Sequence, residues 1–416
     1  MNVRKRLTAL LIILSPTFAV SCLNRGAGDP LSVKYVNTIL SDTTSAGFAR
    51  LKTAGCDGKS GSICIFGPAD ETFVMAEKFL TCDDYDNVTG RRIPDGLPDF
   101  AGECIAVVSD IANAPYQGYI DLSNEEYLRE STVKCYIHGI DSLCALSQYD
   151  RENSVRKRSA KVFVLSSPYL SAYGYRDIQA AVNATGGKVK VISPIHSMFD
   201  AAVRRHGNDA SIAVWTTSER LGAGICSSVL SGLADNYPAM TYEILCPVHE
   251  GDVKERIMSF LRLYKASGQN SGLDAVLVDD MPLSATELNA GMKDIIENGD
   301  DSLFVYTSLL AEGFEFIDAG EAVAGECIRY LRESNQFTHK VAYPSAEFYT
   351  IAPVPGLSAG YTDNGDFTGS FKYNRAPSSD IMTFLMVKSE NRSLQDSIAA
   401  CMRHYAPKTF ELYVSK

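Results

Sequence analysis

Histidine is scarce in this sequence, and the Cys-x-x-C motif is missing altogether. The chain has 416 residues, of which six are histidines spread along its length. Structural and catalytic zinc sites are built from closely spaced cysteine and histidine ligands. Their absence argues against a zinc centre. We therefore expect neither a metal ion nor a cofactor.

The sequence also lacks an excess of positive charge. Its formal net charge is −11 at pH 7, and it becomes −14 if the three basic residues Arg4, Lys5 and Arg6 are removed with a leader. A strongly acidic surface repels nucleic acid and anionic membrane surfaces. Nucleic acid is therefore excluded as a partner, and membrane association would require a lipid anchor.

Long hydrophobic runs are absent except at the N-terminus. The apolar stretch 7–20 follows three basic residues and is shorter than the ~20 residues that span a bilayer. It ends in Ala19-Val20-Ser21-Cys22, which resembles a bacterial lipobox whose cysteine is lipidated after cleavage. We expect residues 1–22 to be a lipoprotein signal peptide. The mature protein would be exported and lipid-anchored in the bacterial cell envelope, at the periplasmic face or the cell surface. An ordinary signal peptide cleaved nearby is the alternative.

Ten cysteines remain after Cys22, an even number in a chain expected to be exported. Such counts suggest a set of disulfides. Paired as neighbours in sequence, they would form Cys56–Cys64, Cys82–Cys104, Cys135–Cys144, Cys226–Cys246 and Cys327–Cys401. Connectivity cannot be read from spacing, so buried thiols remain the alternative.

Strand-like and helix-like segments alternate through the central part of the chain. Within residues 189–233, a β-branched run, a helical stretch, a second apolar run and another helical stretch are joined by short polar loops. This order is typical of a parallel sheet covered by helices on both faces. Ligands of such sheets bind outside the carboxyl ends of the strands. The loops at Ser193-Pro194 and Thr216-Thr217-Ser218 are therefore candidate positions for chemistry.

Four loop motifs occur in an order that is informative as a set. They are Asp110-Ile-Ala-Asn-Ala-Pro-Tyr-Gln-Gly118, Ile212-Ala-Val-Trp-Thr-Thr217, Cys246-Pro-Val-His-Glu250-Gly251 and Phe316-Ile-Asp-Ala-Gly-Glu-Ala-Val-Ala324. From about residue 63 to residue 351 the chain resembles glutamate racemase, of the aspartate/glutamate racemase superfamily. The resemblance implies an α/β fold of two similar three-layer lobes with mostly parallel sheets. A small carboxylate substrate would bind in the cleft between the lobes.

The resemblance also implies a division of the chain. The first lobe would comprise residues 60–195 and 312–350, and the chain would return to it near Phe314. The second lobe would comprise residues 196–311. Residues 23–58 would form a tether and an N-terminal helical segment. Residues 351–416 would be a C-terminal extension, which we expect to pack on the first lobe.

The catalytic positions implied by the resemblance carry unexpected residues. Racemisation at Cα needs an acid–base group on each face, and the family uses two thiols. Here Ser166 occupies the first position and Asp279 or Asp280 the second, while Gly67-Pro68-Ala69 replaces the family's Asp-Ser-Gly. A serine hydroxyl is a far weaker acid than a thiol, and an ionised aspartate would repel a substrate carboxylate. We therefore expect no racemase activity.

The resemblance places five residues at the cleft as candidates for ligand binding: Tyr116, Ser167, Thr216, Thr217 and Glu250. The leading hypothesis is a lipid-anchored extracytoplasmic protein that binds a small carboxylate or amino acid in this cleft. One alternative is a racemase- or isomerase-type enzyme in which Ser166 and an aspartate act as altered acid–base residues. Another is a periplasmic solute-binding or envelope interaction module.

Overall fold

The computed structural model describes residues 33–55, 58–147, 149–247, 250–268, 272–281, 283–299, 303–338, 340, 342–354, 360, 367–377, 382–386 and 392–415. The predicted signal peptide, its lipidation site Cys22 and the disulfide candidate Cys56 lie outside these residues. Among the helices of the described part, none is both long enough and apolar enough to cross a bilayer.

The first lobe is built on an eight-stranded sheet with the order β4-β3-β12-β11-β2-β1-β5-β6. Its strands are β1 (Ser62–Gly67), β2 (Cys104–Asp110), β3 (Leu143–Ser147), β4 (Asp150–Arg156), β5 (Ala160–Leu165), β6 (Lys190–Ile192), β11 (Ser345–Pro353) and β12 (Met382–Met386). The strands from β11 to β6 run parallel, whereas the β3–β4 and β11–β12 pairs are antiparallel. Every residue of β1, β2 and β5 is buried, as expected for a parallel sheet with both faces covered.

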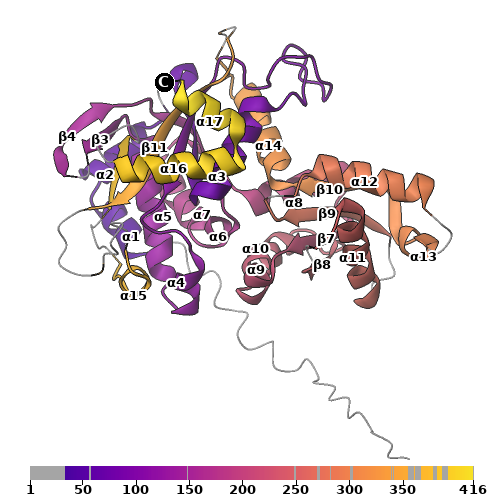
Figure 1. The fold of residues 1–416 in the computed structure, drawn as a ribbon. Coiled ribbons are helices and arrows are strands. Elements are labelled where there is room, and N and C mark those ends of the chain that lie inside the picture. The colour runs from indigo at the N-terminus through magenta and orange to yellow at the C-terminus, as the bar shows by residue number, and fades with distance from the viewer. Residues whose placement is uncertain are drawn as a thin grey trace, which may run out of the picture.

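Helices cover both faces of this sheet. One layer contains α3 (Ala69–Thr81), α14 (Ala319–Glu333), α16 (Arg392–Tyr405) and α17 (Pro407–Val414), and the other contains α1 (Lys34–Ser41), α2 (Ala46–Thr53), α5 (Glu125–Ile140) and α7 (Tyr175–Thr185). Two short helices, α4 (Gln117–Asp121) and α6 (Pro168–Ala172), follow β2 and β5. Figure 1 shows α16 and α17 lying over α3, far from the second lobe.

The second lobe has a four-stranded parallel sheet with the order β10-β9-β7-β8. Its elements are α8 (Pro194–His206), β7 (Ser211–Thr216), α9 (Ser218–Gly222), α10 (Ile225–Ala234), β8 (Thr241–Leu245), α11 (Val253–Ala266), β9 (Leu273–Asp279), α12 (Ala285–Asn298), α13 (Phe304–Thr307) and β10 (Leu310–Asp318). Trp215 of β7 stacks on Phe260 of α11, with ring centroids 5.5 Å apart. Val214, its neighbour in the strand, faces the opposite core. This alternation makes the lobe three-layered.

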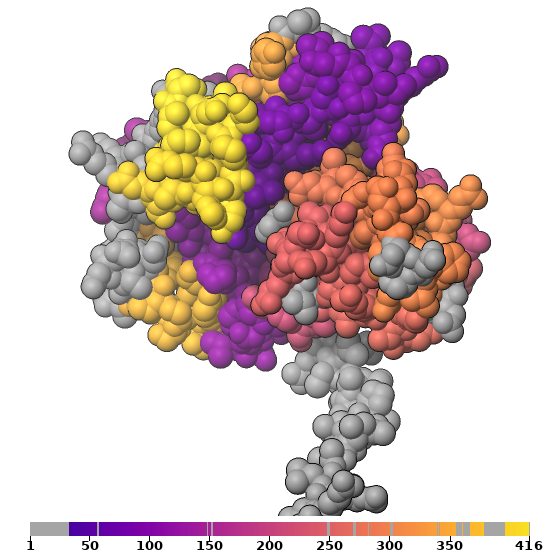
Figure 2. All heavy atoms as spheres, turned by 45° about the vertical axis from the view of Figure 1, so that its right-hand side comes forward, coloured from indigo at the N-terminus to yellow at the C-terminus, as the bar shows by residue number. Residues whose placement is uncertain are grey.

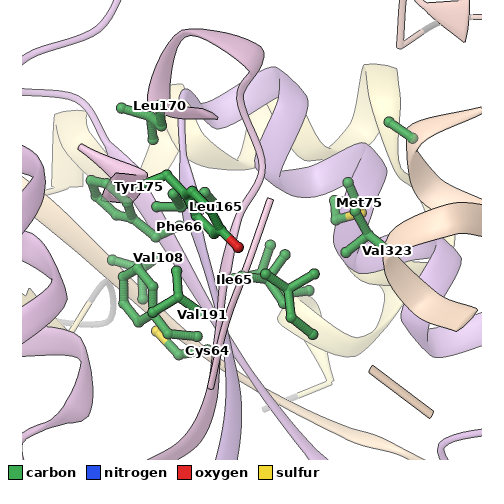
Figure 3. Packing of buried hydrophobic residues seen from close by; sticks show 14 of the residues in the cluster. Cys64, Ile65, Phe66, Met75, Val108, Leu165, Leu170, Tyr175, Val191 and Val323 are labelled. Carbon is green, nitrogen blue, oxygen red and sulfur yellow. The ribbon is translucent and has the colours of Figure 1, made fainter. Parts of the chain in front are cut away.

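One of the two hydrophobic clusters extends through both lobes. Ile212 and Val214 of β7 belong to the same buried cluster as Ile65 and Phe66 of β1, because α8 and α10 lie between the two sheets. Figure 3 shows part of this cluster, in which Phe66 lies among residues from neighbouring strands and helices. Shared burial of this kind holds the two halves together through the hydrophobic effect.

The expected fold class is confirmed: the chain forms two α/β lobes with mostly parallel sheets. Two details of the expected division differ. The strand containing Phe314 does not return to the first lobe, because β10 pairs with β9 and Phe316 packs in the second core. The C-terminal residues do more than pack on the first lobe, because β12 is inserted between β11 and β3.

Four of the five predicted disulfides have both cysteines among the described residues, and these four are not formed. The fifth, Cys56–Cys64, includes a cysteine outside the described residues. None of the nine described cysteines is disulfide-bonded. Cys82 lies beside Asp99, whose negative charge together with burial raises the thiol pKa well above its usual value. Burial alone raises the pKa of Cys64 to about 12. An even number of cysteines does not predict which of them lie close together in the fold. Here most of the described cysteines pack as small buried side chains.

Candidate functional site

A cleft of about 860 Å³ opens where strands β1, β2, β5 and β7 end. Four of its walls are the loops that follow these strands, and the fifth is the segment around α15 (Gly369–Tyr373). The lobes meet beside it, with the second lobe in salmon to orange and the first in indigo to purple in Figure 2. Its position at the carboxyl ends of parallel strands is the one expected for a ligand site.

Arg220 of α9 connects the two lobes at the cleft. Its guanidinium is bonded to Glu71 of α3 in the first lobe and to Asp279 at the end of β9 in the second. Its Nη1 donates to the Asp279 backbone oxygen at 2.8 Å and lies 3.2 Å from Oδ1. One cation therefore serves two carboxylates from different lobes.

Asp279 has its oxygens occupied within the protein. Thr216 Oγ1 donates to Oδ2 at 2.8 Å, and Cys226 Sγ donates to the same oxygen at 3.1 Å. Burial raises the Asp279 pKa, and Arg220 opposes the shift. Burial and the adjacent carboxylate raise the Cys226 pKa well above its usual value, so this thiol is a poor source of thiolate. Neither residue lines the cleft.

Glu71 and Ser167 line the cleft and have buried polar atoms with few partners. Glu71 is 8% exposed, and its Oε2 has no donor among the described residues other than the Ser167 hydroxyl. Ser167 is fully buried, and its hydroxyl acts on the Glu71 carboxyl as a hydrogen-bond donor. Burial raises the pKa of Glu71 to about 7, and Arg220 and the Ser167 hydroxyl only partly offset this shift. Buried polar atoms are nearly always paired, and these two have few partners in the described wall beyond one another.

Asp110, at the end of β2, is a second buried carboxylate in the cleft wall. Tyr116 Oη donates to its Oδ2 at 3.0 Å, and Asn113 Nδ2 donates to Oδ1 at 2.7 Å. Burial raises its pKa to about 6 despite these bonds. Both carboxyl groups therefore change charge close to neutral pH.

Tyr169 of α6 forms a polar contact across the mouth of the cleft. Its hydroxyl lies 2.8 Å from Glu219 Oε1 of the second lobe and 2.7 Å from Gln117 Oε1 of the first. The hydroxyl has a single proton, so it donates to one of these oxygens at a time. Together with the Arg220–Glu71 pair, this contact closes the cleft on the side of the second lobe.

The C-terminal segment supplies one wall through Phe367 and Lys372. Lys372 Nζ donates to the Ala114 backbone oxygen at 2.6 Å. Behind it, the Arg375 guanidinium stacks on the rings of Tyr127 and Phe367, each 4.6 Å away. This segment was expected only to pack on the first lobe, yet it forms part of the site.

The structure brings together three of the five predicted ligand-binding residues. Tyr116, Ser167 and Thr217 line the cleft, whereas Thr216 lies behind it with its hydroxyl on Asp279. Glu250 is exposed and does not line the cleft. It follows β8, the edge strand on the far side of β7, which explains its distance from the loops that do.

The predicted catalytic positions do not face the cavity. Ser166 is fully buried, donates to the Phe66 backbone oxygen at 3.1 Å and lies 2.9 Å from Thr72 Oγ1. Asp280 is half-buried and is not among the lining residues. The groups that do line the cleft and titrate near neutrality, Glu71 and Asp110, were missed as ionisable candidates. The one feature of the sequence that could have indicated Glu71 is its position just after the loop that follows a buried strand.

No family model matches the chain, and no curated protein matches it. Solved structures do match. They include glutamate racemase isoform RacE1 from Bacillus anthracis, at 15% identity, 70% coverage of this chain, 89% of that chain and a TM-score of 0.40. Glutamate racemase from Francisella tularensis subsp. tularensis SCHU S4 in complex with D-glutamate matches at 11% identity, with 70% of this chain and 88% of that chain covered and a TM-score of 0.41. Allantoin racemase from Klebsiella pneumoniae matches at 12% identity, with 68% of this chain and 95% of that chain covered and a TM-score of 0.32.

At these identities and TM-scores, neither activity nor substrate follows from the likeness. Within the described part of the chain, no cluster of three or more His, Cys, Asp or Glu side chains is arranged to hold a metal ion.

Proposed function

We propose that this chain is an exported, lipid-anchored protein of the bacterial cell envelope that binds a small amino acid or carboxylate between its lobes, without two-thiol racemisation. The supporting observation is the cleft with two buried polar atoms, Glu71 Oε2 and Ser167 Oγ, that have few partners among the described residues beyond one another. Its volume, about 860 Å³, is within the range of small-molecule sites. A polar ligand would satisfy both atoms.

The chemistry of the cleft wall supports binding without thiol catalysis. None of the described residues that line it is a cysteine. Cys226, behind the wall, donates to Asp279, and its raised pKa keeps it protonated. Ser166 and Asp279 have internal hydrogen-bond partners, so the two positions implied by the family resemblance are not available to take a proton from a ligand.

Binding is tested with the mature chain in a thermal-shift panel of amino acids and dicarboxylates. A ligand that binds the folded state raises the melting temperature by mass action. We expect at least one compound to do so and Ser167→Ala to weaken its effect. Ser231→Ala, on the exposed face of α10, is the matched control. A panel without a shift at millimolar concentration would contradict the proposal.

The export and anchoring part of the proposal depends on the leader sequence and is tested separately. Cells expressing the full chain should incorporate radiolabelled palmitate into it, and the label should fractionate with membranes. Cys22→Ala should remove the label because the acceptor thiol is lost. A full chain that stays unlabelled and cytosolic would contradict export and lipid anchoring, and it would not bear on the proposed ligand binding.

A second candidate is an enzyme that moves a proton with carboxyl groups in place of thiols. The observation in its favour is that Glu71 and Asp110 both line the cleft with pKa values raised to about 7 and about 6. Groups that titrate near working pH are suited to acid–base catalysis. Deuterium incorporation at Cα of a panel of amino acids tests it. Exchange should be lost in Glu71→Gln, and a panel without exchange would leave binding as the function.

A further inference from the structure

We propose that the ligand of the cleft is an organic cation, a small molecule carrying an ammonium or guanidinium group, and not a dicarboxylate. The inference rests on the proposed function, namely that a small molecule occupies this cleft. It concerns the charge of that molecule, because the charged groups of the cleft wall limit the ligand's charge more than the cleft volume limits the ligand's size.

The first observation is the charge balance of the wall. Among the described residues that line the cleft, four are acidic and two are basic. The acidic ones are Asp70, Glu71, Asp110 and Glu219, and the basic ones are Arg220 and Lys372. A cleft with an excess of one sign concentrates ligands of the opposite sign.

The second observation is that both basic side chains are engaged by the protein. Arg220 is shared between Glu71 and Asp279. Lys372 Nζ donates to the Ala114 backbone oxygen at 2.6 Å. A ligand with two carboxylates would therefore meet four acidic groups, with Arg220 already paired to carboxylates and Lys372 as the remaining positive charge of the described wall. Like charges at close range repel.

The third observation is independent of the charge count. Glu71 Oε2, in a residue that is 8% exposed, has no donor among the described residues other than the neighbouring Ser167 hydroxyl. Ser167 Oγ is fully buried, receives no N–H from the described residues and can accept one. An ammonium or guanidinium offers several donors and no acceptor, which matches these two atoms. Contact with them requires a small opening of the wall, because both atoms are buried.

Aromatic rings form the remaining part of the wall. Tyr116 and Tyr169 line the cleft in an edge-on arrangement with centroids 6.4 Å apart, and Phe367 lines it from the C-terminal segment. Ring faces attract cations through their quadrupole. The combination of rings with carboxylates is typical of sites for amines and guanidines and is unusual for dicarboxylates.

The affinity of a cation should therefore rise with pH. Protonated Glu71 and Asp110 are neutral, and their pKa values of about 7 and about 6 place the change near neutrality. A bound cation favours the ionised carboxylates and releases protons, whereas a bound anion would take protons up. The charged and titratable groups that act on these two carboxyls are Asp70, Arg220, Asp279, Tyr116, Tyr119, Tyr127, Cys135 and Arg375.

Isothermal titration of the mature chain tests the inference with two sets of probes. The cationic set is putrescine, agmatine and L-arginine, and the anionic set is succinate, L-glutamate and D-glutamate. We expect a cationic probe to bind, with affinity several-fold higher at pH 8 than at pH 5.5 and with proton release. Glu71→Gln should weaken it about tenfold, the size expected for one charge-assisted hydrogen bond.

Two further variants keep the test decisive. Glu219→Gln removes a more exposed carboxylate of the same wall and should also weaken the cation if Glu71→Gln fails to fold. Glu297→Gln, on the outer helix α12, should leave the affinity unchanged. Binding of the anionic set alone would overturn the inference and leave the proposed function standing. If neither set of probes binds, the inference and the proposed function are both contradicted. Cation binding that is unaffected by Glu71→Gln and Glu219→Gln would contradict the inference, because the cation would then bind outside this cleft.

Discussion

At the scale of single residues, Glu71 shows how the fold sets the chemistry of the cleft. Its carboxylate shares the Arg220 guanidinium with Asp279. Burial dominates over this partial compensation and raises its pKa from 4.5 to about 7. The same side chain thus costs stability when ionised and provides the cleft with a titrating group.

The free energy of unfolding should depend on pH because of the raised Glu71 pKa. Because the pKa of Glu71 is higher in the folded state, the folded state binds more protons than the unfolded state between pH 4.5 and about 7. Its contribution to the free energy of unfolding is therefore full below pH 4.5 and is lost as pH rises through about 7. Urea denaturation of wild type and Glu71→Gln across this range measures it. The free energy of the variant relative to wild type should increase with pH, and parallel curves would contradict the prediction.

Gly67 is required for a steric reason. A Cβ at this position would lie 2.2 Å from Ser166 Oγ and 3.4 Å from Thr72 Oγ1. Gly67→Ala should destabilise the protein by ~1–3 kcal/mol, as overpacking in cores does. Ser166→Ala removes the clashing atom, so the double variant should recover part of the loss. Gly222→Ala, with open space around it, is the control. Equal melting temperatures of Gly67→Ala and wild type would refute the account.

At the scale of elements, Arg375 is the centre of a polar network that joins the C-terminal segment to the cleft. Arg375 Nη2 donates to Asn113 Oδ1 at 2.7 Å and to Tyr119 Oη at 2.5 Å. Asn113 in turn bonds Asp110. The segment and the loop after β2 therefore form one buried polar network, which positions the wall that Phe367 and Lys372 contribute.

Arg375→Lys tests this connection while keeping the charge. Lysine lacks the planar fork that stacks on Tyr127 and Phe367 and donates to two partners at once. We expect a loss of about 2 kcal/mol in the free energy of unfolding and faster proteolysis near α15 in the native state. Arg403→Lys, at an exposed contact with Phe410, should change neither. Unchanged proteolysis of Arg375→Lys would show that other contacts hold the segment.

At the scale of the whole molecule, the cysteines distinguish a reduced core from a disulfide framework. Of the nine described cysteines, all but Cys246 and Cys401 are buried. Raised pKa values make the buried thiols weak nucleophiles. They are thereby protected even in an oxidising compartment.

Mass spectrometry after alkylation measures this directly. In the native mature chain Cys246 and Cys401 should be labelled first, and the buried thiols only after denaturation, without any reductant. We expect their reactivity to follow global unfolding because they are buried in the packed lobes. Buried positions that become labelled only after reduction would show the originally expected disulfides to exist.

The sequence by itself determined the fold class. Runs such as Ile63–Phe66 and Ile212–Trp215 are apolar throughout, and only strands covered on both faces tolerate that composition. The resemblance of the loop motifs to glutamate racemase also placed Tyr116, Ser167 and Thr217 near one cleft, at the edge of the sheet where loops after parallel strands meet. Local periodicity and turn residues carry the strand and helix pattern, so the fold class could be predicted without coordinates.

Only the tertiary structure decided the chemistry of that cleft. Glu71 and Arg220 are 149 positions apart, and α9 brings them together across the lobes. Arg375 reaches Asn113 over a similarly long separation, 262 positions. Burial, which raises the pKa of Glu71 and Asp110, depends on what the whole chain packs around them. The same packing of elements far apart in sequence placed β10 in the second sheet and kept the cysteines apart from their expected partners.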